Sequence, residues 1–104
     1  MEIFLPWIIL NKRRALLNIF RTKSYLKDYA KIKLSDKHYT KYISYLGALI
    51  SSVELPPEAL NHSLHGKYKD YKEFHISGDV LVVYIIEDNF LKLVRIGTHS
   101  QIFN

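Results

Sequence analysis

The sequence predicts an α+β fold, in which an N-terminal strand and a helical hairpin pack on a twisted antiparallel sheet that ends in a three-stranded meander. Three observations lead to this fold class. Apolar residues recur at the helical period in the first half of the chain. In the second half the pattern changes to that of strands. Short polar turns separate the last three strands, so neighbours along the chain are expected to pair antiparallel.

The first half is expected to contain one strand and two helices. The segment ALLNIFR, residues 15–21, is assigned to the strand. Ser24 is placed to cap a short helix over residues 24–33. A longer helix with a clear apolar period then continues to about Ser52, and two prolines in the segment 54–60 prevent its continuation. A short turn joins the two helices, which therefore form a hairpin.

The second half is expected to supply the meander. Residues 71–77, YKEFHIS, alternate in polarity, which places Tyr71, Glu73 and His75 on one face of a strand. After a tight Ser-Gly turn, residues 80–86 are continuously apolar, as in a strand buried on both faces. The turn EDN leads into a last strand over residues 90–96. Each turn is short, so the order of these three strands is fixed by chain connectivity.

Residues 15–104 are expected to form a single domain, because a chain of 104 residues suffices for one compact domain and not for two. Residues 1–14 are treated as an N-terminal extension. Its apolar run, MEIFLPWIIL, is too short to span a bilayer, and its charge order is unlike that of a signal peptide. An extra edge strand, an arm for a partner, a membrane-docking segment and sequence upstream of the native start all stay open for it.

The composition favours a polyanionic partner and a reducing compartment. Fifteen Lys and Arg stand against ten Asp and Glu, which gives a net charge of +5; a basic surface of this kind suits RNA, DNA or an acidic protein. The absence of cysteine excludes disulfides, thiolate zinc sites and cysteine nucleophiles. We expect a cytoplasmic protein without a membrane partner.

Three polar residues are expected to meet at one edge of the meander. His75 ends the first of its strands, Asp79 begins the second and His99 follows the third. His62 lies in the segment that feeds the meander, and Arg95 precedes the glycine that opens the final loop. Histidine exchanges a proton near neutral pH. Such groups suit cleavage of RNA through the ribose 2′-OH, with a cation such as Arg95 stabilising the phosphorane and with no metal or other cofactor.

Two other interpretations of the histidines stay open. His62, His65, His75, Asp79 and His99 can together supply metal ligands, although their spacing matches no established zinc signature. Alternatively, each histidine lies on the surface or caps an element without a chemical role.

The residues from 61 to 103 carry a family pattern. The chain resembles the YafQ branch of the RelE-like bacterial toxins in the order and spacing of the following positions: His62, Leu64, Gly66, Tyr68, Glu73, His75, Asp79, Tyr84, Arg95, Gly97, Thr98, His99, Ile102 and Phe103. Two positions depart from the pattern, since the family often has Trp in place of Tyr68 and an aromatic residue in place of Val80. His65 has no counterpart, and residues 1–14 fall outside the resemblance.

The resemblance implies a toxin of a type II toxin-antitoxin system, with a microbial-ribonuclease-like α+β fold. It implies an endoribonuclease that cleaves mRNA on the ribosome and is inhibited by a cognate antitoxin of the DinJ or RelB kind. Carried over by position, the catalytic residues are His62, His75, Asp79 and His99, with His99 as the leading proton-transfer group. Arg95, Phe103, Lys67 and Lys69 are expected to bind the substrate. Which group acts as base and which as acid is not assigned.

A binding module of the same fold is the alternative function. It would hold RNA or a protein partner without cleavage, and it would need neither the histidines nor Asp79 at these positions.

Overall fold

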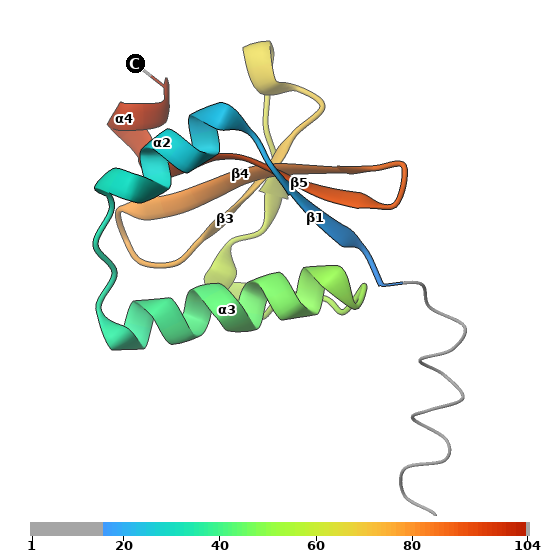
Figure 1. The fold of residues 1–104 in the computed structure, drawn as a ribbon, viewed down its shortest axis with the longest axis horizontal. Helices are drawn as coiled ribbons and strands as arrows, with labels where there is room; N and C mark the ends of the chain where they lie inside the picture. Colours follow the sequence, from blue (N-terminus) through green and yellow to red (C-terminus); the bar gives the residue numbers. More distant parts are fainter. Residues whose placement is uncertain (1–15, 104) are drawn as a thin grey trace, which may run out of the picture.

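The computed structural model describes residues 16–103. A five-stranded sheet is covered by helices, as Figure 1 shows. The N-terminal extension expected over residues 1–14 lies outside the described residues. The elements, in chain order, are β1 (Asn18–Arg21), α2 (Lys23–Lys31), α3 (Asp36–Ile50), the 3₁₀ turn η1 (Pro57–Ala59), β2 (His62–Ser63), the 3₁₀ turn η2 (Gly66–Tyr68), β3 (Lys72–His75), β4 (Val80–Glu87), β5 (Phe90–Thr98) and α4 (His99–Phe103).

The predicted fold class is confirmed, and so is the meander. The strand order is β1-β5-β4-β3-β2, and β3, β4 and β5 pair antiparallel with their chain neighbours. Two features correct the expected sheet. β1 pairs with β5 in parallel, so the sheet is mixed rather than wholly antiparallel. A two-residue strand, β2, pairs with β3 and was not predicted, because two residues carry no period that a sequence pattern can reveal.

The helical hairpin is confirmed, although its first helix begins earlier than expected. Thr22, rather than Ser24, is the N-cap of α2, and its hydroxyl accepts a hydrogen bond of 3.1 Å from the N–H of Tyr25. Ser35 caps α3 in the same way through the N–H of His38. The last helix, α4, was not predicted, since the segment after β5 was expected to be a loop.

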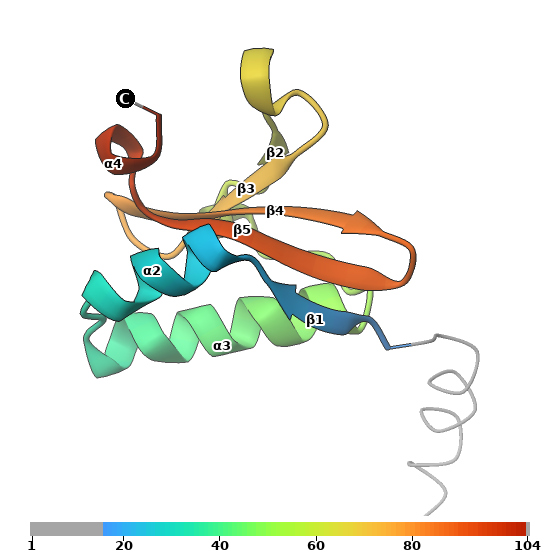
Figure 2. The same ribbon diagram turned by 45° about the horizontal axis from the view of Figure 1, so that its top comes forward.

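The two faces of the sheet are covered by different elements. Figures 1 and 2 show α3 on one side of the sheet and α4, with the loop around η2, on the other. The larger core lies on the α3 side and includes Leu46, Phe74 and Tyr84. A smaller apolar cluster lies on the α4 side, around Leu81 and Ile102. The buried side chain of Ile102 anchors α4 in that cluster.

A β-bulge in β5 decides where Arg95 points. Val83 is paired with Arg95, whereas the next residue of β4 is paired with Leu93, so Val94 is the extra residue. Without the bulge, alternation from Leu93 would turn Arg95 into the larger core. With it, Ile96 takes the core position instead, and Arg95 stays partly exposed. None of the helices within residues 16–103 has the length and apolar character needed to cross a bilayer.

Candidate active site

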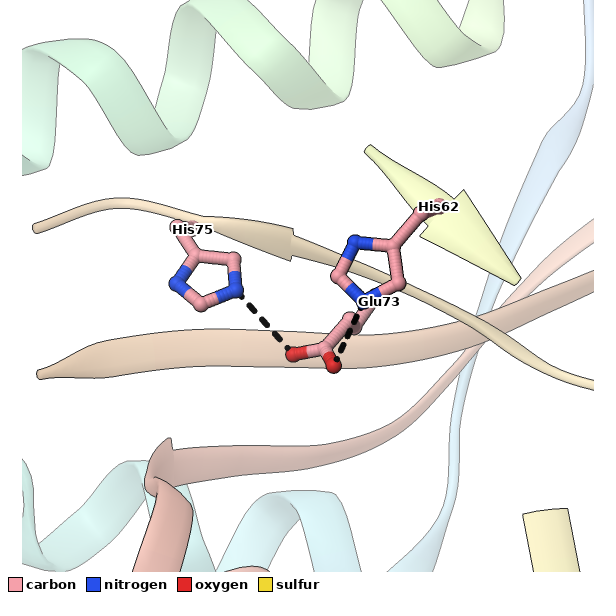
Figure 3. A group of neighbouring side chains, drawn as sticks. All are labelled: His62, Glu73 and His75. Carbon is pink, nitrogen blue, oxygen red and sulfur yellow. Dashed lines mark ion pairs between the residues drawn. The ribbon is translucent and has the colours of Figure 1, made fainter. Parts of the chain in front are cut away.

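Two histidines and one acid form a compact group at the edge of the sheet that β2 forms. His62 comes from β2, and Glu73 and His75 come from β3; the register pairs His62 directly with Glu73. The Nε2 atom of His62 lies 3.2 Å from Oε1 of Glu73, and Nε2 of His75 lies 3.2 Å from Oε2. Figure 3 shows the carboxylate between the two imidazole rings. The alternation of β3 explains the group, because it turns Glu73 and His75 to one face and Phe74 into the core.

The carboxylate of Glu73 is buried, whereas its partners differ in exposure. The Glu73 side chain is 6% exposed, His75 is 20% exposed and His62 is 53% exposed. Oε2 of Glu73 is buried without a hydrogen bond, despite the nearby His75 nitrogen. A buried carboxylate is costly unless a positive charge or a proton compensates it. Burial therefore favours a proton or a cation beside Glu73.

The contacts of His62 show how its ring is oriented towards Glu73. Its Nδ1 atom lies 2.6 Å from the carbonyl oxygen of Leu60, so Nδ1 donates there. A neutral imidazole has one N–H only, and its Nε2 would then face the acceptor Oε1 of Glu73 without a hydrogen between them. The lone pair of Nε2 and Oε1 therefore face each other at 3.2 Å, where a proton or a bound cation would compensate them. Leu60 adopts the left-handed conformation, at φ 50°, and its position after η1 aims its carbonyl at His62.

His99 follows β5 at the end of the meander where β3 ends, and a capping box holds it there. Thr98 Oγ1 accepts from the N–H of Gln101 at 3.2 Å, and the Gln101 side chain accepts from the N–H of Thr98 at 2.8 Å. This reciprocal pair starts α4, whose first residue is His99. A Cβ on Gly97 would lie 2.8 Å from Oε1 of Gln101, so glycine at this position leaves room for the cap.

Three aromatic rings, those of Phe103, Tyr68 and Tyr71, form an aromatic group that packs against His99 through Phe103. The His99 ring lies 4.7 Å from that of Phe103, and Phe103 packs edge-on against Tyr68 at 5.5 Å. Tyr68 in turn packs edge-on against Tyr71. Edge-to-face packing of this kind fixes the relative orientation of the rings. Phe103 therefore acts on His99 by packing, and it is also half-buried against the smaller apolar cluster.

Arg95 reaches α2 rather than the other expected site residues. Its guanidinium forms two hydrogen bonds with the Asp28 carboxylate, of 2.6 and 3.2 Å. The hydrogen bond that Arg95 donates to Asp28 is the main cause of a raised pKa of Arg95. The Tyr68 hydroxyl adds to the rise. Arg95 is thus a fixed cation between α2 and the aromatic group.

The expected meeting of His75, Asp79 and His99 holds for the backbone and not for the side chains. Val80 pairs with Thr98, and Leu81 lies between His75 and Gly97, so all three chain segments reach one end of the meander. Asp79 is exposed, and no ion pair joins it to a histidine among residues 16–103. The His75 side chain turns instead towards Glu73.

The remaining expected residues lie around the site. Lys67 and Lys69 are exposed on the η2 loop, with Lys67 Nζ 5.7 Å from the centre of the Tyr68 ring. His65 is exposed and lies outside the group of His62, Glu73 and His75. A pocket of about 290 Å³ opens beside His75, between η1 and the turn after β3.

Glu73 is the site residue that sequence reasoning missed. The alternating pattern had already placed it on the face of His75, and that pattern is the signal that points to it. What the sequence did not show is β2, whose pairing brings His62 to the same carboxylate.

The geometry combines a carboxylate between two imidazoles, a third imidazole on a short helix, and a fixed cation. Proton transfer at two points around a phosphate is the chemistry that such an arrangement supports. Such a group of side chains on a small α+β fold is typical of ribonuclease-like proteins.

The comparisons with known proteins identify the family. The sequence model of the bacterial toxin of type II toxin-antitoxin systems, YafQ, matches residues 17–104. The chain therefore belongs to the YafQ toxin family, as the sequence resemblance predicted.

Known relatives and solved structures agree. A protein of Haemophilus influenzae that carries the YafQ toxin name is 38% identical over 66 residues, which cover 60% of this chain and 65% of that protein. The mRNA interferase toxin YafQ of Escherichia coli is 32% identical over 82% of this chain and 98% of its own. A copper-bound mutant toxin from Helicobacter pylori has a TM-score of 0.74 at 34% identity, over 85% of this chain and all of that one. The Escherichia coli DinJ-YafQ complex has a TM-score of 0.72 at 26% identity, over 85% and 99%.

Proposed function

We propose that this chain is the toxin of a type II toxin-antitoxin system and cleaves mRNA in the cytoplasm, on the translating ribosome. Family membership supports the toxin role, and the Escherichia coli relative that bears the mRNA interferase name supports the substrate class. The single observation that carries the chemistry is the placement of His62 and His75 on either side of the Glu73 carboxylate, on the sheet face from which α4 presents His99.

The proposed reaction is attack of a ribose 2′-oxygen on the adjacent phosphate. A base removes the 2′-OH proton, the new O–P bond forms, and the bond to the departing 5′-oxygen breaks as an acid protonates it. The products are a 2′,3′-cyclic phosphate and a free 5′-OH. His99 serves one of the two proton transfers, and His62 or His75, held by Glu73, serves the other. Asp79 and Arg95 act on the phosphate side, with Arg95 stabilising the developing negative charge.

Substrate contacts extend from this centre over the η2 loop. Lys67 and Lys69 are exposed beside the aromatic group, where they can bind phosphates of the RNA. Phe103 is half-buried next to His99, so its exposed edge can also stack with a base.

Mapping the ends of a translated mRNA tests this function. In a translating extract the parent protein should produce defined 5′ ends, and His99→Ala should abolish them by removing one proton donor or acceptor. Omitting ribosomes should also abolish cleavage. Equal cleavage by parent and folded His99→Ala, as judged by circular dichroism, would overturn the assigned chemistry. RNA or ribosome binding without any cleavage by the parent would support the non-catalytic module instead.

The antitoxin partner is proposed from the family and from the DinJ-YafQ complex of Escherichia coli. Co-expression of the small protein encoded beside this chain should restore growth and give a complex that co-purifies. Growth arrest that this protein fails to relieve would contradict a neighbouring antitoxin.

A second candidate function is transition-metal binding at His62, Glu73 and His75. One ligand atom from each of these residues lies within 4.8 Å of the others, and Oε2 of Glu73 is buried without a hydrogen bond. Two imidazoles and a carboxylate suit Cu²⁺, Zn²⁺ or Ni²⁺, and the Helicobacter pylori toxin is known in a copper-bound form. A bound metal would occupy the lone pairs that proton transfer requires, so it would inhibit cleavage.

Calorimetric titration with CuCl₂ distinguishes this binding from activity. The parent should bind one ion, His62→Ala and His75→Ala should bind much more weakly, and His65→Ala should bind like the parent because His65 lies outside the group. Unchanged affinity in His75→Ala would refute the site.

A further inference from the structure

Helix α2 and its N-cap lie along the outer edge of β5, beyond the point where the pairing of β5 with β1 ends. The pairing of β1 with β5 stops at Arg21 and Leu93. Beyond it, the Thr22 N–H donates to the Leu93 carbonyl at 3.1 Å and the Thr22 hydroxyl donates to the Val94 carbonyl at 2.9 Å. Figure 2 shows α2 lying along β5 in this region. The N-cap residue of α2 thus makes the hydrogen bonds that a neighbouring strand would otherwise make at this edge.

Asp28, which lies within α2, also binds this edge of β5, at Arg95 and Ile96. Oδ2 accepts both from Arg95 Nε at 2.6 Å and from the Ile96 N–H at 3.1 Å, while Oδ1 accepts from Arg95 Nη2 at 3.2 Å. The backbone hydrogen bond fixes the carboxylate, and the two bonds to the guanidinium fix its plane and rotation. The side chains of Asp28 and Arg95 are only 18% and 24% exposed, so water screens the pair little.

The arrangement leaves part of the guanidinium free. Arginine carries more N–H groups than the two that Asp28 engages. Arg95 lines a pocket of about 260 Å³ between α2 and α4, together with Lys31 and Gln101. Lys31 brings a second positive charge, which outweighs the single negative charge of Asp28. The free N–H groups therefore border a space with a net positive charge, next to the helix that carries His99.

We propose that Asp28 is a positioning residue for RNA cleavage: it holds Arg95 so that the free guanidinium N–H groups bind an RNA phosphate in this pocket. This inference rests on the proposed function for its substrate. Asp28 itself does not touch the RNA. Its action passes through Arg95, because its carboxylate oxygens are engaged by Arg95 and Ile96.

The variant Asp28→Asn separates this role from a structural one. The amide oxygen of asparagine can still accept from the Ile96 N–H, whereas the charge that orders Arg95 is lost. Glu87→Gln is the matched control: it also removes a carboxylate paired with a cation of β5, Lys92 at 2.6 Å, but at the opposite end of the strand.

The experiment is a double-mutant cycle of mRNA cleavage in the translating extract. Asp28→Asn and Arg95→Gln should each slow cleavage by about tenfold or more. The double variant should be no slower than Arg95→Gln alone, since Asp28 acts through Arg95. Glu87→Gln should cleave like the parent. Parental cleavage by Asp28→Asn, or losses that multiply in the double variant, would overturn the proposal.

A second measurement keeps this proposal separate from the proposed function. The NMR signal of the Arg95 Nε–H should be protected from exchange in the parent, shift when a short RNA oligonucleotide is added, and be lost in Asp28→Asn. A parent that shows this signal and shift without cleaving RNA would contradict the nuclease function and still support the positioning role. A signal that is unchanged in Asp28→Asn would overturn the positioning role alone.

Discussion

The Nε2 atom of His62 lies 3.2 Å from the Glu73 carboxylate, while Nδ1 of the same ring donates to the carbonyl oxygen of Leu60. Both nitrogens of this exposed imidazole are thus oriented by partners on the protein. A general acid or base needs this kind of fixed geometry as much as a suitable proton affinity. Glu73 is therefore the residue on which the orientation of His62 depends.

Replacing the acid with its amide tests that dependence. In Glu73→Gln the carboxylate between the two imidazoles becomes a neutral amide, so it no longer stabilises a positive charge on either ring and offers one acceptor oxygen instead of two. We expect mRNA cleavage to fall at least about tenfold, with retained circular dichroism. Glu87→Gln, which removes an exposed carboxylate far from the site, serves as the control. Cleavage at the parental rate by Glu73→Gln would show that the carboxylate is dispensable.

Two glycines should respond to alanine in opposite ways. A methyl group on Gly97 would lie 2.8 Å from the Gln101 side chain and displace it from the Thr98 N–H. Loss of a helix cap costs about 1 kcal/mol, so Gly97→Ala should lower the free energy of unfolding and also slow cleavage through His99. Gly47 lies inside α3 with open space around it. Gly47→Ala should raise the free energy of unfolding by about 0.5–1 kcal/mol.

Urea unfolding of both variants measures the difference. Equal stability changes in the two variants would show that the close contact at Gly97 relaxes without cost to the cap.

Stability should fall at alkaline pH because of a buried tyrosine pair between α2 and α3. The hydroxyls of Tyr25 and Tyr42 are hydrogen-bonded to each other, and burial raises the pKa of both phenols above the ordinary value of 10.0. In the unfolded chain these phenols ionise near pH 10, whereas the fold keeps them protonated. The contribution of these two phenols to the free energy of unfolding is therefore complete below pH 10, and it falls as the pH rises above 10.

Urea unfolding between pH 8 and pH 11 checks the sign. The decline should be about 1.4 kcal/mol per pH unit for each affected tyrosine, and Tyr25→Phe should decline less steeply than the parent. At pH 8 the same variant should be less stable by about 1–3 kcal/mol, because it leaves the Tyr42 hydroxyl without its partner. An alkaline decline that is as steep in Tyr25→Phe would assign it to other groups.

The sequence predicted the parts of this fold that have a period. The long helix α3 and the strands β3, β4 and β5 lie within a few residues of their expected positions, because their apolar side chains follow the helical or strand pattern and pack into the two apolar clusters. The parallel pairing of β1 and the two-residue β2 were missed. Both depend on contacts between distant segments, which leave no local pattern.

In the site, too, local pattern predicted some features, whereas contacts between distant segments determine the others. The sequence placed His75, Asp79 and His99 at one end of the meander, and their backbones are there. It did not foresee that His75 turns to Glu73, or that Arg95 turns to Asp28, a residue 67 positions earlier in the chain. The bulge at Val94 causes part of the second error, since it changes the face on which Arg95 lies.

The contact between Tyr68 and Phe103 gives a final test of the aromatic support under His99. Tyr68 packs edge-on against Phe103 at 5.5 Å, and Phe103 lies 4.7 Å from His99. Tyr68→Ala removes the first ring and also the hydroxyl near Arg95, so His99 should lose orientation and cleavage should fall about tenfold. Tyr68→Trp keeps an aromatic edge against Phe103 and should retain most of the activity.

The control for this pair is Phe90→Ala. Phe90 is a partly exposed aromatic residue at the start of β5, at the end of the strand away from His99. Its removal should leave the cleavage rate unchanged, which separates a local effect on His99 from a general loss of aromatic surface. Cleavage rates and thermal unfolding are measured for all three variants. If Tyr68→Ala cleaves mRNA as fast as Tyr68→Trp, the orientation of His99 does not depend on this packing.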